Sequence, residues 1–452
     1  MTWKAKNTFT PDHGFPVIAS ADIVVAGGGA AGVAAAATAA SEGKAVLLVE
    51  RYGFCGGNAV AGLSGTICGM FLASESESRK AEQVVFGFTD TFYRAMKASG
   101  GVTAPQRYGK TWTVTHDPHV WRETAEALLL ERGVSVLYHA LIIGVIVADE
   151  TIRGLIVATK SGLGAIEAQV TIDATGDADV VHLAGLDYTV GDGGVVQNPT
   201  MIFRLGGVDV ARFLEYWGPD TICAPEVSTM IRDADASGRY SLPRSKIWLF
   251  PTPRPGELLC NATRVMGRDG RELRADLTED LTEAEIAGRL QVREYASFLR
   301  DHVPGCKTSF VNDTGVQAGI RQSRSAVGQQ RLSNADVISR RKRRDGIARS
   351  PWPIELHSGT KPKLEWLIED FYEVPYGTLV PVRGEGLLVT GRCLSAEHEA
   401  LASARVTAQC FQYGQAAALA AVRSLETGTA LRELDGEEIR ELMNKNGARL
   451  DD

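Results

Sequence analysis

The chain has 452 residues, of which 44% are hydrophobic and 23% are charged, and its formal net charge at pH 7 is −7. This is the composition of a globular protein with room for two large domains, and it argues against general disorder. The acidic balance gives no electrostatic reason to expect nucleic acid or an anionic membrane surface as a partner.

The first informative segment is an uncharged run that lies between Asp22 and Glu42. Its length is within the range of a membrane helix. However, three consecutive glycines at residues 27–29 interrupt it, and most of the rest is alanine, which gains little from entering lipid. The β-branched residues at 23–26 predict a short buried strand, and residues 30–41 predict a helix. We therefore expect no membrane partner.

The junction between this strand and this helix has the spacing G-x-G-x-x-G, at Gly27, Gly29 and Gly32. The first glycine permits a sharp turn, the second lets a pyrophosphate approach the backbone, and the third lets the helix pack on the strand. Free N–H groups at the start of the helix then face the phosphates. Residues 45–49 predict a second parallel strand, which ends at Glu50, where a carboxylate can accept both ribose hydroxyls. This order of elements predicts a dinucleotide site.

The next segments distinguish a flavin from a nicotinamide. Apolar runs predict further strands at 134–138, 142–148, 152–158 and 165–172. Their short connections are typical of a β-meander. The last strand leads into residues 173–177, Asp-Ala-Thr-Gly-Asp, a turn of small residues that lets the backbone approach a ligand. No second G-x-G-x-x-G motif occurs in the sequence, so we do not expect the separate nicotinamide domain of a disulfide reductase.

The C-terminal region contains a second strand and helix. Residues 387–390 predict a strand that Gly391 ends, and a long alanine-rich stretch from Ser403 predicts a helix with serine as its N-cap. Arg405 in the first turn is unfavourable against the helix dipole unless an anion lies there. The N1–C2=O edge of a flavin, which gains negative charge on reduction, would be such an anion.

Together these segments resemble the FAD-dependent oxidoreductase family whose flavin domain is of the glutathione-reductase and fumarate-reductase type. The similarity of pattern extends over most of residues 20–425. The segments that carry it are residues 27–32, 50–51, 56–57, 173–177, 198–207 (Asn-Pro-Thr-Met-Ile-Phe-Arg-Leu-Gly-Gly), 319–321 and 391–422. The FAD motifs are specific, whereas the middle ones place the family without fixing a substrate.

The resemblance implies an α/β fold with a Rossmann-like FAD-binding domain that contains a β-meander. We expect this domain to comprise residues 20–190 and 371–452. An inserted α+β substrate domain is expected at residues 191–370, with a strand at 246–250 and a helix at 281–300.

The resemblance also implies which residues bind the cofactor. They are Gly27, Gly29, Ala30, Ala31, Gly32, Glu50, Arg51, Gly56, Gly57, Asn58, Ala174, Thr175, Gly176, Asp177, Gly391, Arg392, Arg405 and Val406. FAD is expected to be non-covalent, because the fumarate-reductase-like histidine motif for covalent attachment is absent near the N-terminus. Many relatives have Gly-Asp where this chain has Gly391 and Arg392, and that aspartate binds the ribityl chain, so the ribityl partner is left open here.

Two histidines and a tyrosine are candidates for the catalytic chemistry. His398, flanked by Glu397 and Glu399, precedes the flavin-facing helix and is a candidate to accept a substrate proton while hydride passes to flavin N5. A surface histidine in an acidic loop is the alternative. His357, in Pro-Ile-Glu-Leu-His, is a candidate substrate contact. Tyr376 is a candidate proton donor, although a packed turn aromatic is the favoured interpretation.

Several arginines are candidates for binding negative charge. Arg321 and Arg324 lie three apart on a predicted helix and share a face, so they either bind an anionic substrate or form exposed ion pairs. Arg405 either binds the flavin, which we favour, or holds a substrate carboxylate with two hydrogen bonds. The basic run at residues 340–344 has acidic neighbours and no aromatic residues, so we interpret it as a solvated helix face.

The seven cysteines are an odd set without a C-x-x-C pair, which fits neither a disulfide framework nor a metal site of the zinc type. A reducing compartment is the simpler interpretation. Residues 1–20 contain no continuous apolar segment, so we expect a cytoplasmic protein without a secretory signal. By the resemblance Cys55 lies close to the flavin, either as a redox-active thiol or as a small buried residue, which we favour.

The function expected from the sequence is a cytoplasmic FAD-dependent dehydrogenase or oxidase. It would move a hydride from a small polar organic substrate to flavin N5 and pass the electrons to O2, a quinone or a carrier protein. One alternative is a flavin monooxygenase that uses NAD(P)H and O2. Another is an electron-transfer module with a protein partner. The sequence leaves open whether the chain forms a homo-oligomer.

Overall fold

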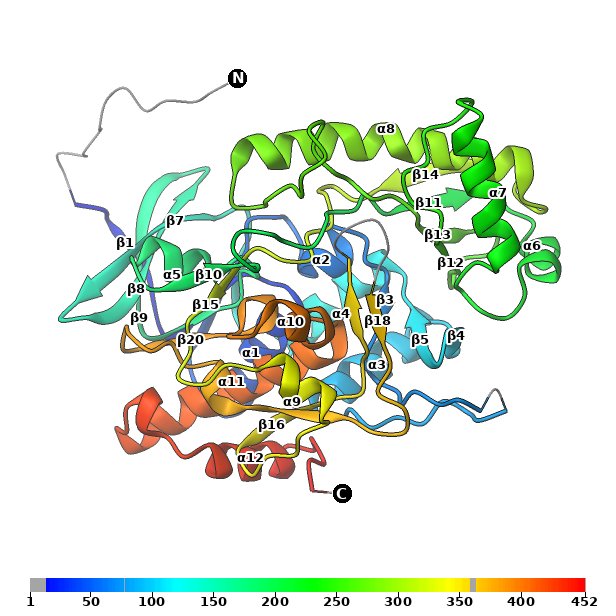
Figure 1. Cartoon of the computed structure of the whole chain (residues 1–452). Helices are drawn as coiled ribbons and strands as arrows, with labels where there is room; N and C mark the ends of the chain where they lie inside the picture. Colours follow the sequence, from blue (N-terminus) through cyan, green and yellow to red (C-terminus); the bar gives the residue numbers. More distant parts are fainter. Residues whose placement is uncertain (1–13, 77, 358–362, 452) are drawn as a thin grey trace.

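The computed structural model describes residues 14–76, 78–357 and 363–451, and its central element is a seven-stranded sheet (Figure 1). The strands follow the order β6 (Ser135–Leu137), β2 (Val46–Val49), β1 (Val17–Ala26), β9 (Gly162–Asp173), β8 (Thr151–Thr159) and β7 (Leu141–Ala148), and β20 (Leu387–Val389) also pairs with β9. Pairing is parallel from β6 through β2 and β1 to β9 and β20. It is antiparallel from β9 to β8 and β7, so the expected β-meander is confirmed.

The start of the chain forms the predicted strand, turn and helix. β1 ends in four fully buried residues, and α1 (Ala30–Ser41) has the bounds expected from the sequence. α1 packs against α11 (Thr407–Thr427), which lies beside it in Figure 1, and alanines are common among the buried residues of both helices. A Cβ atom added to Gly414 would lie 2.0 Å from the carbonyl oxygen of Ala31, so only glycine permits this approach. The uncharged run is therefore uncharged because it is buried in protein.

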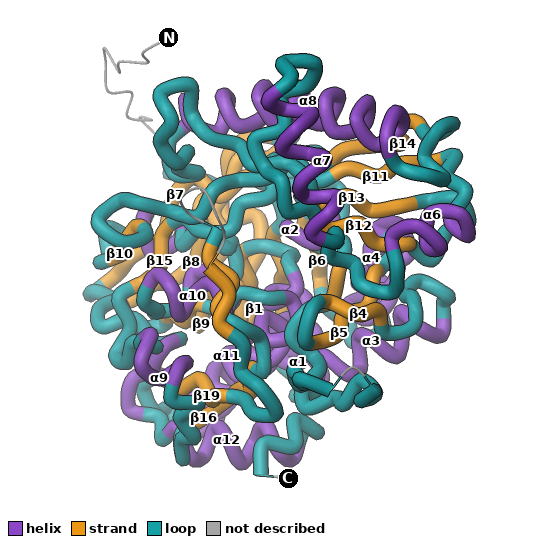
Figure 2. The backbone as a smooth tube through the Cα atoms, turned by 45° about the vertical axis from the view of Figure 1, so that its right-hand side comes forward, coloured by secondary structure: helices purple, strands orange, loops and turns teal. Residues whose placement is uncertain are grey.

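A second, antiparallel sheet lies between the main sheet and α8 (Thr278–His302), as Figures 1 and 2 show. Its strands follow the order β12 (Trp248–Pro251), β13 (Leu258–Asn261), β11 (Phe203–Gly206) and β14 (Phe310–Thr314). Together with α6 (Val210–Trp217) and α7 (Pro225–Ala236), this sheet and α8 enclose a separate hydrophobic core that includes Phe203, Phe213, Tyr295 and Phe298. The strand expected at 246–250 begins at Trp248, and the expected helix extends a few residues further at both ends.

Shorter elements surround these two sheets. The remaining strands are β3 (Thr66–Ile67), β4 (Gln106–Tyr108), β5 (Thr111–Thr115), β10 (Tyr188–Val190), β15 (Arg324–Ala326), β16 (Gly346–Ser350), β17 (Ile354–Leu356), β18 (Lys363–Glu365) and β19 (Tyr372–Pro375). The remaining α-helices are α2 (Gly57–Val60), α3 (Phe88–Ala98), α4 (Pro118–Leu130), α5 (Asp179–Leu183), α9 (Asn334–Ile338), α10 (His398–Ala404) and α12 (Gly436–Lys445). Among the described residues, no helix is long and apolar enough to cross a membrane.

The C-terminal helix does not begin where the sequence pattern suggested. Ser403 is not an N-cap, because it lies inside α10 with its hydroxyl buried. Its Oγ donates to the carbonyl oxygen of Trp352 at 2.5 Å and accepts from the hydroxyl of Tyr372 at 2.9 Å. The chain then breaks at Arg405 and Val406, and α11 begins at Thr407. Arg405 therefore precedes the long helix instead of lying in its first turn.

Two other expected helices are wrong. Residues 321–323 have no regular structure and Arg324 begins β15, because this segment pairs with β10 in an antiparallel ladder. Arg321 and Arg324 thus do not share a helix face. The basic run at 340–344 follows α9 in a loop, where Arg341 pairs with Asp336.

Candidate functional site

A cleft lies at the carboxyl ends of the parallel strands β1, β2, β9 and β20. In open α/β sheets this edge is where ligands bind, because the loops that follow neighbouring strands converge there. Every cofactor residue expected from the sequence except Gly32 lines the cleft. Gly32 lies behind the turn, where an added Cβ would come within 1.8 Å of the carbonyl oxygen of Gly27, so it serves the packing of α1 on β1.

At the start of α1 the cleft is lined by backbone atoms. Gly29 is the N-cap of α1, no side chain caps this helix, and its first turn holds no acidic residue. A Cβ atom added to Gly29 would meet no protein atom closer than the Cα of Gly57, at 3.8 Å. The helix start therefore presents unobstructed N–H groups and the positive end of its dipole to the cleft, which suits a phosphate.

Glu50 lies at the end of β2, as the motif predicts. Its Oε2 accepts from the N–H of Gly28 at 2.6 Å and its Oε1 accepts from the N–H of Tyr52 at 2.9 Å. Burial raises the pKa of this carboxyl, and the two backbone donors oppose the shift. Each carboxylate oxygen has a further lone pair, so Glu50 can still accept ribose hydroxyls from the cleft.

The turn after β9 is shaped by Asp173, a residue that was not among the expected cofactor residues. Its Oδ1 accepts from the N–H and the hydroxyl of Thr175, at 3.1 and 2.7 Å, and its Oδ2 accepts from the N–H of Val180 at 3.0 Å. These bonds hold Ala174 and the following residues against the cleft. Beyond them the Oδ1 of Asp177 lies 2.9 Å from Nη2 of Arg392.

The other end of the cleft is formed by buried polar residues from segments far apart in the sequence. Oε1 of Glu355, on β17, accepts from the hydroxyl of Tyr108 at 2.8 Å and lies 3.2 Å from Nε2 of His357. All three side chains are buried. A backbone hydrogen bond connects this group to Asn198, whose N–H donates to the carbonyl oxygen of His357 at 2.9 Å.

The protonation states of this pair follow from their surroundings. Burial and the nearby charge of Arg321 lower the pKa of His357 to about 3, so the imidazole is neutral. Burial alone would raise the pKa of Glu355, but contact with His357, the hydroxyl of Tyr108 and the charge of Arg405 hold it at about 2. Glu355 is therefore an ionised carboxylate.

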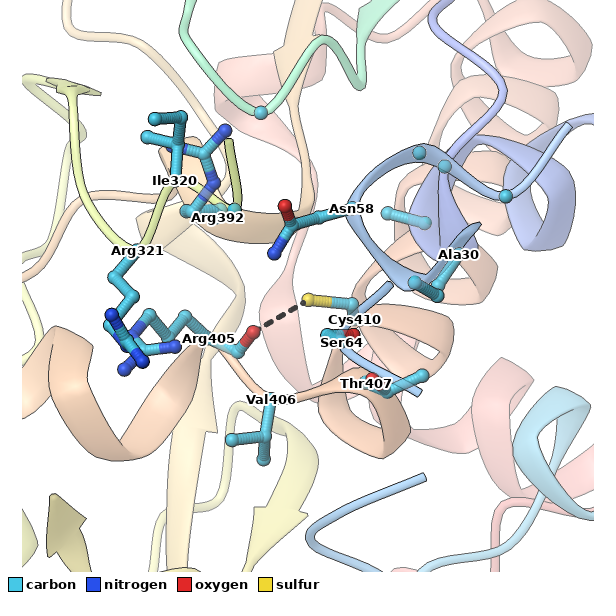
Figure 3. A pocket seen from close by; sticks show the side chains of 18 of the residues that line it. Ala30, Asn58, Ser64, Ile320, Arg321, Arg392, Arg405, Val406, Thr407 and Cys410 are labelled. Atoms are coloured by element: carbon cyan, nitrogen blue, oxygen red, sulfur yellow. Dashed lines mark hydrogen bonds between the residues drawn. The ribbon is translucent and has the colours of Figure 1, made fainter. Parts of the chain in front are cut away.

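Two guanidinium groups meet beside this pair, and Figure 3 shows Arg321 and Arg405 reaching the same end of the cavity, away from Ala30. Nη1 of Arg321 donates to the carbonyl oxygen of Asn198 at 2.6 Å. Nη2 of Arg405 donates to the side-chain oxygen of Gln197 at 3.0 Å. Both guanidinium groups interact electrostatically with the carboxylate of Glu355. Two positive charges therefore face one negative charge, and this end of the cleft is positively charged.

The sequence profile described as FAD dependent oxidoreductase matches residues 22–443. This chain belongs to the FAD-dependent oxidoreductase family. A comparison with curated protein sequences found no match.

Several solved structures are similar to this oxidoreductase in fold. A geranylgeranyl bacteriochlorophyll reductase-like protein from Thermoplasma acidophilum is 15% identical with a TM-score of 0.49, and the match covers 95% of this chain and 85% of that one. A flavin-dependent brominase is 14% identical with a TM-score of 0.47, covering 94% and 83%. A p-nitrophenol 4-monooxygenase from Pseudomonas putida is 11% identical with a TM-score of 0.47, covering 96% and 88%. At these identities the reaction of this oxidoreductase does not follow from theirs.

The cleft of the oxidoreductase fits FAD. The bare helix start at Gly29 and Ala30 suits the pyrophosphate, and Glu50 suits the adenine-side ribose. Asn58 lines the middle of the cleft with a buried Oδ1 that has no hydrogen-bond partner among the described residues. Arg405 and Val406, at the uncapped start of α11, would face the flavin, where the charge of Arg405 and the positive end of the helix dipole suit a ring that gains negative charge.

The structure separates the catalytic candidates. His357 and Arg321 line the cleft, whereas His398 and Tyr376 do not. His398 begins α10 and is half-buried, and burial lowers its pKa. Tyr376 is buried and donates its hydroxyl to the carbonyl oxygen of Leu431 at 2.9 Å, which is the packed aromatic favoured from the sequence. Arg324 pairs with Asp179 at 3.0 Å.

Cys55 also lies outside the cleft lining. Its Sγ is buried beneath the glycine-rich turn, 2.8 Å from where a Cβ atom of Gly28 would stand. Burial raises the pKa of this thiol to about 12, so it is not a thiolate. These features support the packing role.

Sequence reasoning missed Glu355, Tyr108 and Arg244. Glu355 had a usable signal, because it precedes His357 by two residues and side chains two apart share a face of an extended segment. Tyr108 and Arg244 come from short strands and loops far away in the sequence, with no motif around them. Only the tertiary structure brings Tyr108 to the cleft and Arg244 to the cavity that adjoins it.

Proposed function

We propose that this oxidoreductase is a dehydrogenase that oxidises a small polar organic substrate, with His357 as the proton acceptor. The observation that carries the proposal is the buried pair of a neutral imidazole and an ionised carboxylate, His357 and Glu355, in the same cleft as the FAD-binding residues. An imidazole held by a carboxylate is a recurrent arrangement for accepting a proton.

The tautomer of His357 follows from its partner. A neutral imidazole has one N–H donor and one acceptor nitrogen. Because Nε2 faces the carboxylate of Glu355, the proton lies on Nε2 and Nδ1 is the acceptor. Glu355 fixes this tautomer and would stabilise the imidazolium formed when Nδ1 takes a proton. The hydroxyl of Tyr108 holds Glu355 in place from its other side.

The proposed reaction breaks a C–H bond and an O–H or N–H bond of the substrate and forms a C=O or C=N bond. FAD, when bound, supplies the acceptor for the hydride, which carries two electrons. His357 takes the remaining proton at Nδ1. The two electrons then pass to an external acceptor, which we propose to be O2, a quinone or a carrier protein.

The same cleft supports a flavin domain of the glutathione-reductase and fumarate-reductase type with non-covalent FAD. The glycine-rich turn, the acid at the end of β2 and the helix start after Arg405 all line one cleft. Denaturation should therefore release free FAD from the yellow protein. Protein that is colourless and does not bind added FAD would contradict this part of the proposal.

The reaction class is tested by an anaerobic screen of flavin bleaching. Alcohols, amines and hydroxy acids are mixed with the oxidised holoenzyme in the absence of NAD(P)H and of any protein partner. Bleaching by one of these compounds alone is the expected result. Rapid bleaching by NAD(P)H only, with an aromatic compound present, would instead identify a monooxygenase. Bleaching only by a protein donor would identify an electron-transfer module.

A further inference from the structure

A second cavity of about 810 Å3 adjoins the cofactor cleft, and the two share Arg321 and His357 in their linings. Its charged lining residues are Lys110, Arg232, Arg244, Lys246, Arg264 and Arg321, and among the described residues one carboxylate, Asp220. The chain as a whole carries a net charge of −7. A cavity with this positive lining in an acidic protein concentrates anions and guides them inward.

The inner end of this cavity holds positive charge in excess. Arg244 and Arg321 are buried and Arg405 is half-buried beside Glu355, the one carboxylate that the described residues place among them, and His357 is neutral. Burial and the neighbouring Arg244 and Arg405 lower the pKa of Arg321 well below its usual value. Burying like charges together is costly unless an opposite charge joins them.

Unused hydrogen-bond donors lie at the same place. Nη2 of Arg244, Nε of Arg405 and Nδ2 of Asn198 are buried, and none has a hydrogen-bond partner among the described residues. Arg244 is held by other bonds, from Nε to the carbonyl oxygen of Lys246 at 2.8 Å and from Nη1 to Oδ1 of Asn261 at 2.9 Å. Its guanidinium also stacks over Trp248 at 4.2 Å. The free donor is thus fixed in position, as in a preorganised anion site.

We propose that the substrate is a carboxylate that enters through the second cavity and binds to Arg321 and Arg244. The carboxylate compensates the excess charge and accepts from the free donors, and it leaves the oxidisable carbon beside His357. Because the anion offsets the charge of Arg321, it also makes His357 more basic at the moment of reaction. This inference rests on the proposed function, since it names the substrate class of the same site.

The experiment measures binding to the oxidised holoenzyme without turnover. The probes are two matched pairs, succinate with succinamide and benzoate with benzamide, and binding is followed by calorimetry and by perturbation of the flavin spectrum. We expect at least one carboxylate to bind more tightly than its amide, and its binding to weaken as salt is raised. Equal binding of acid and amide, or binding of neither acid, overturns the proposal.

Variants locate the site. Arg321→Gln should weaken carboxylate binding by roughly 10- to 100-fold, because a hydrogen-bonded charge partner is lost. The matched control is Arg324→Gln, which removes an arginine paired with Asp179 outside both cavities and should leave binding unchanged. Thermal unfolding of each apoprotein shows whether the variant folds, and Arg321→Lys, which keeps the charge, should recover part of the affinity. Unchanged carboxylate binding in folded Arg321→Gln overturns the proposal.

The two proposals fail in different ways. If carboxylates bind at Arg321 but no compound bleaches the flavin directly, the substrate class stands and the dehydrogenase reaction is wrong. If a neutral alcohol or amine bleaches the flavin and no carboxylate binds, the dehydrogenase stands and the substrate class is wrong.

Discussion

Nε2 of His357 lies 3.2 Å from Oε1 of Glu355, and both side chains are buried, His357 where the two cavities adjoin and Glu355 in the lining of the cofactor cleft. One residue separates them in the chain, yet the pair depends on the hydroxyl of Tyr108, which donates to the same oxygen from another sheet. Contact with Glu355 keeps the proton of the neutral imidazole on Nε2, so Nδ1 is the nitrogen that can accept a proton.

His357→Gln should retain FAD and slow anaerobic reduction of the flavin by substrate. The expected loss is about 10²- to 10⁴-fold, the usual contribution of a general base. Stopped-flow bleaching measures the rate. The matched control is His398→Ala, which changes a histidine outside the cleft and should leave the rate unchanged. An unchanged rate in His357→Gln, or a slow rate in the control, would contradict the assignment.

Acid should destabilise the protein partly through His357. Its pKa is about 3 in the folded protein and near 6.5 when unfolded, so between these values only the unfolded state binds the proton. Stability therefore falls as pH is lowered through this window, by at most about 1.4 kcal/mol per pH unit for this residue. Asp173 acts in the opposite direction, because burial raises its pKa to about 6.

The contribution of His357 is isolated by comparing urea unfolding of wild type and His357→Gln from pH 7 to pH 4. The variant should lose less stability on acidification, by an amount corresponding to one proton. Parallel curves for wild type and His357→Gln would contradict a buried, neutral His357.

Gly29→Ala should yield a folded protein without FAD. Gly29 has a φ of −69°, which alanine adopts, and its added Cβ would meet no close protein atom. The stability of the apoprotein should fall by only about 1 kcal/mol, the cost of alanine at an N-cap. Gly32→Ala is the contrasting variant, because its Cβ would lie 1.8 Å from the carbonyl oxygen of Gly27 and should damage the fold itself. Normal FAD content in Gly29→Ala would exclude a phosphate site at this turn.

Arg392→Gln should weaken FAD binding and destabilise the apoprotein. Removing the guanidinium leaves the carboxylate of Asp177 mostly buried beside Ser323 without its cation. A cost of roughly 1–3 kcal/mol is expected, less than for a fully buried pair because both side chains keep some solvent contact. The double variant Arg392→Gln/Asp177→Asn should recover most of the apoprotein stability in urea unfolding. Additive losses in the double variant would mean that the ion pair does not couple the two residues.

The cofactor half of the site was predictable because its residues follow consecutive elements of one local pattern. The turn at Gly27 to Gly32, the acid Glu50 and the turn after residue 172 all come directly after strands, and parallel strands end at one edge. The residue at which a helix begins was harder to predict from the sequence. Ser403 resembles an N-cap in sequence, but its hydroxyl is buried on Trp352 and Tyr372, so tertiary contacts placed the helix start four residues later.

By itself the sequence determined the first strand, turn and helix and the edge of the sheet at which the expected cofactor residues gather, since short-range spacing encodes these elements, and its resemblance to a family indicated FAD. Only the tertiary structure decided which charged side chains share the reaction end of the cleft. Arg244 and Arg321 come from segments far from the pair of Glu355 and His357, and no local periodicity relates the two arginines to that pair. Their grouping, and the positive charge that points to a carboxylate, arise because the fold brings these distant segments together beside β17.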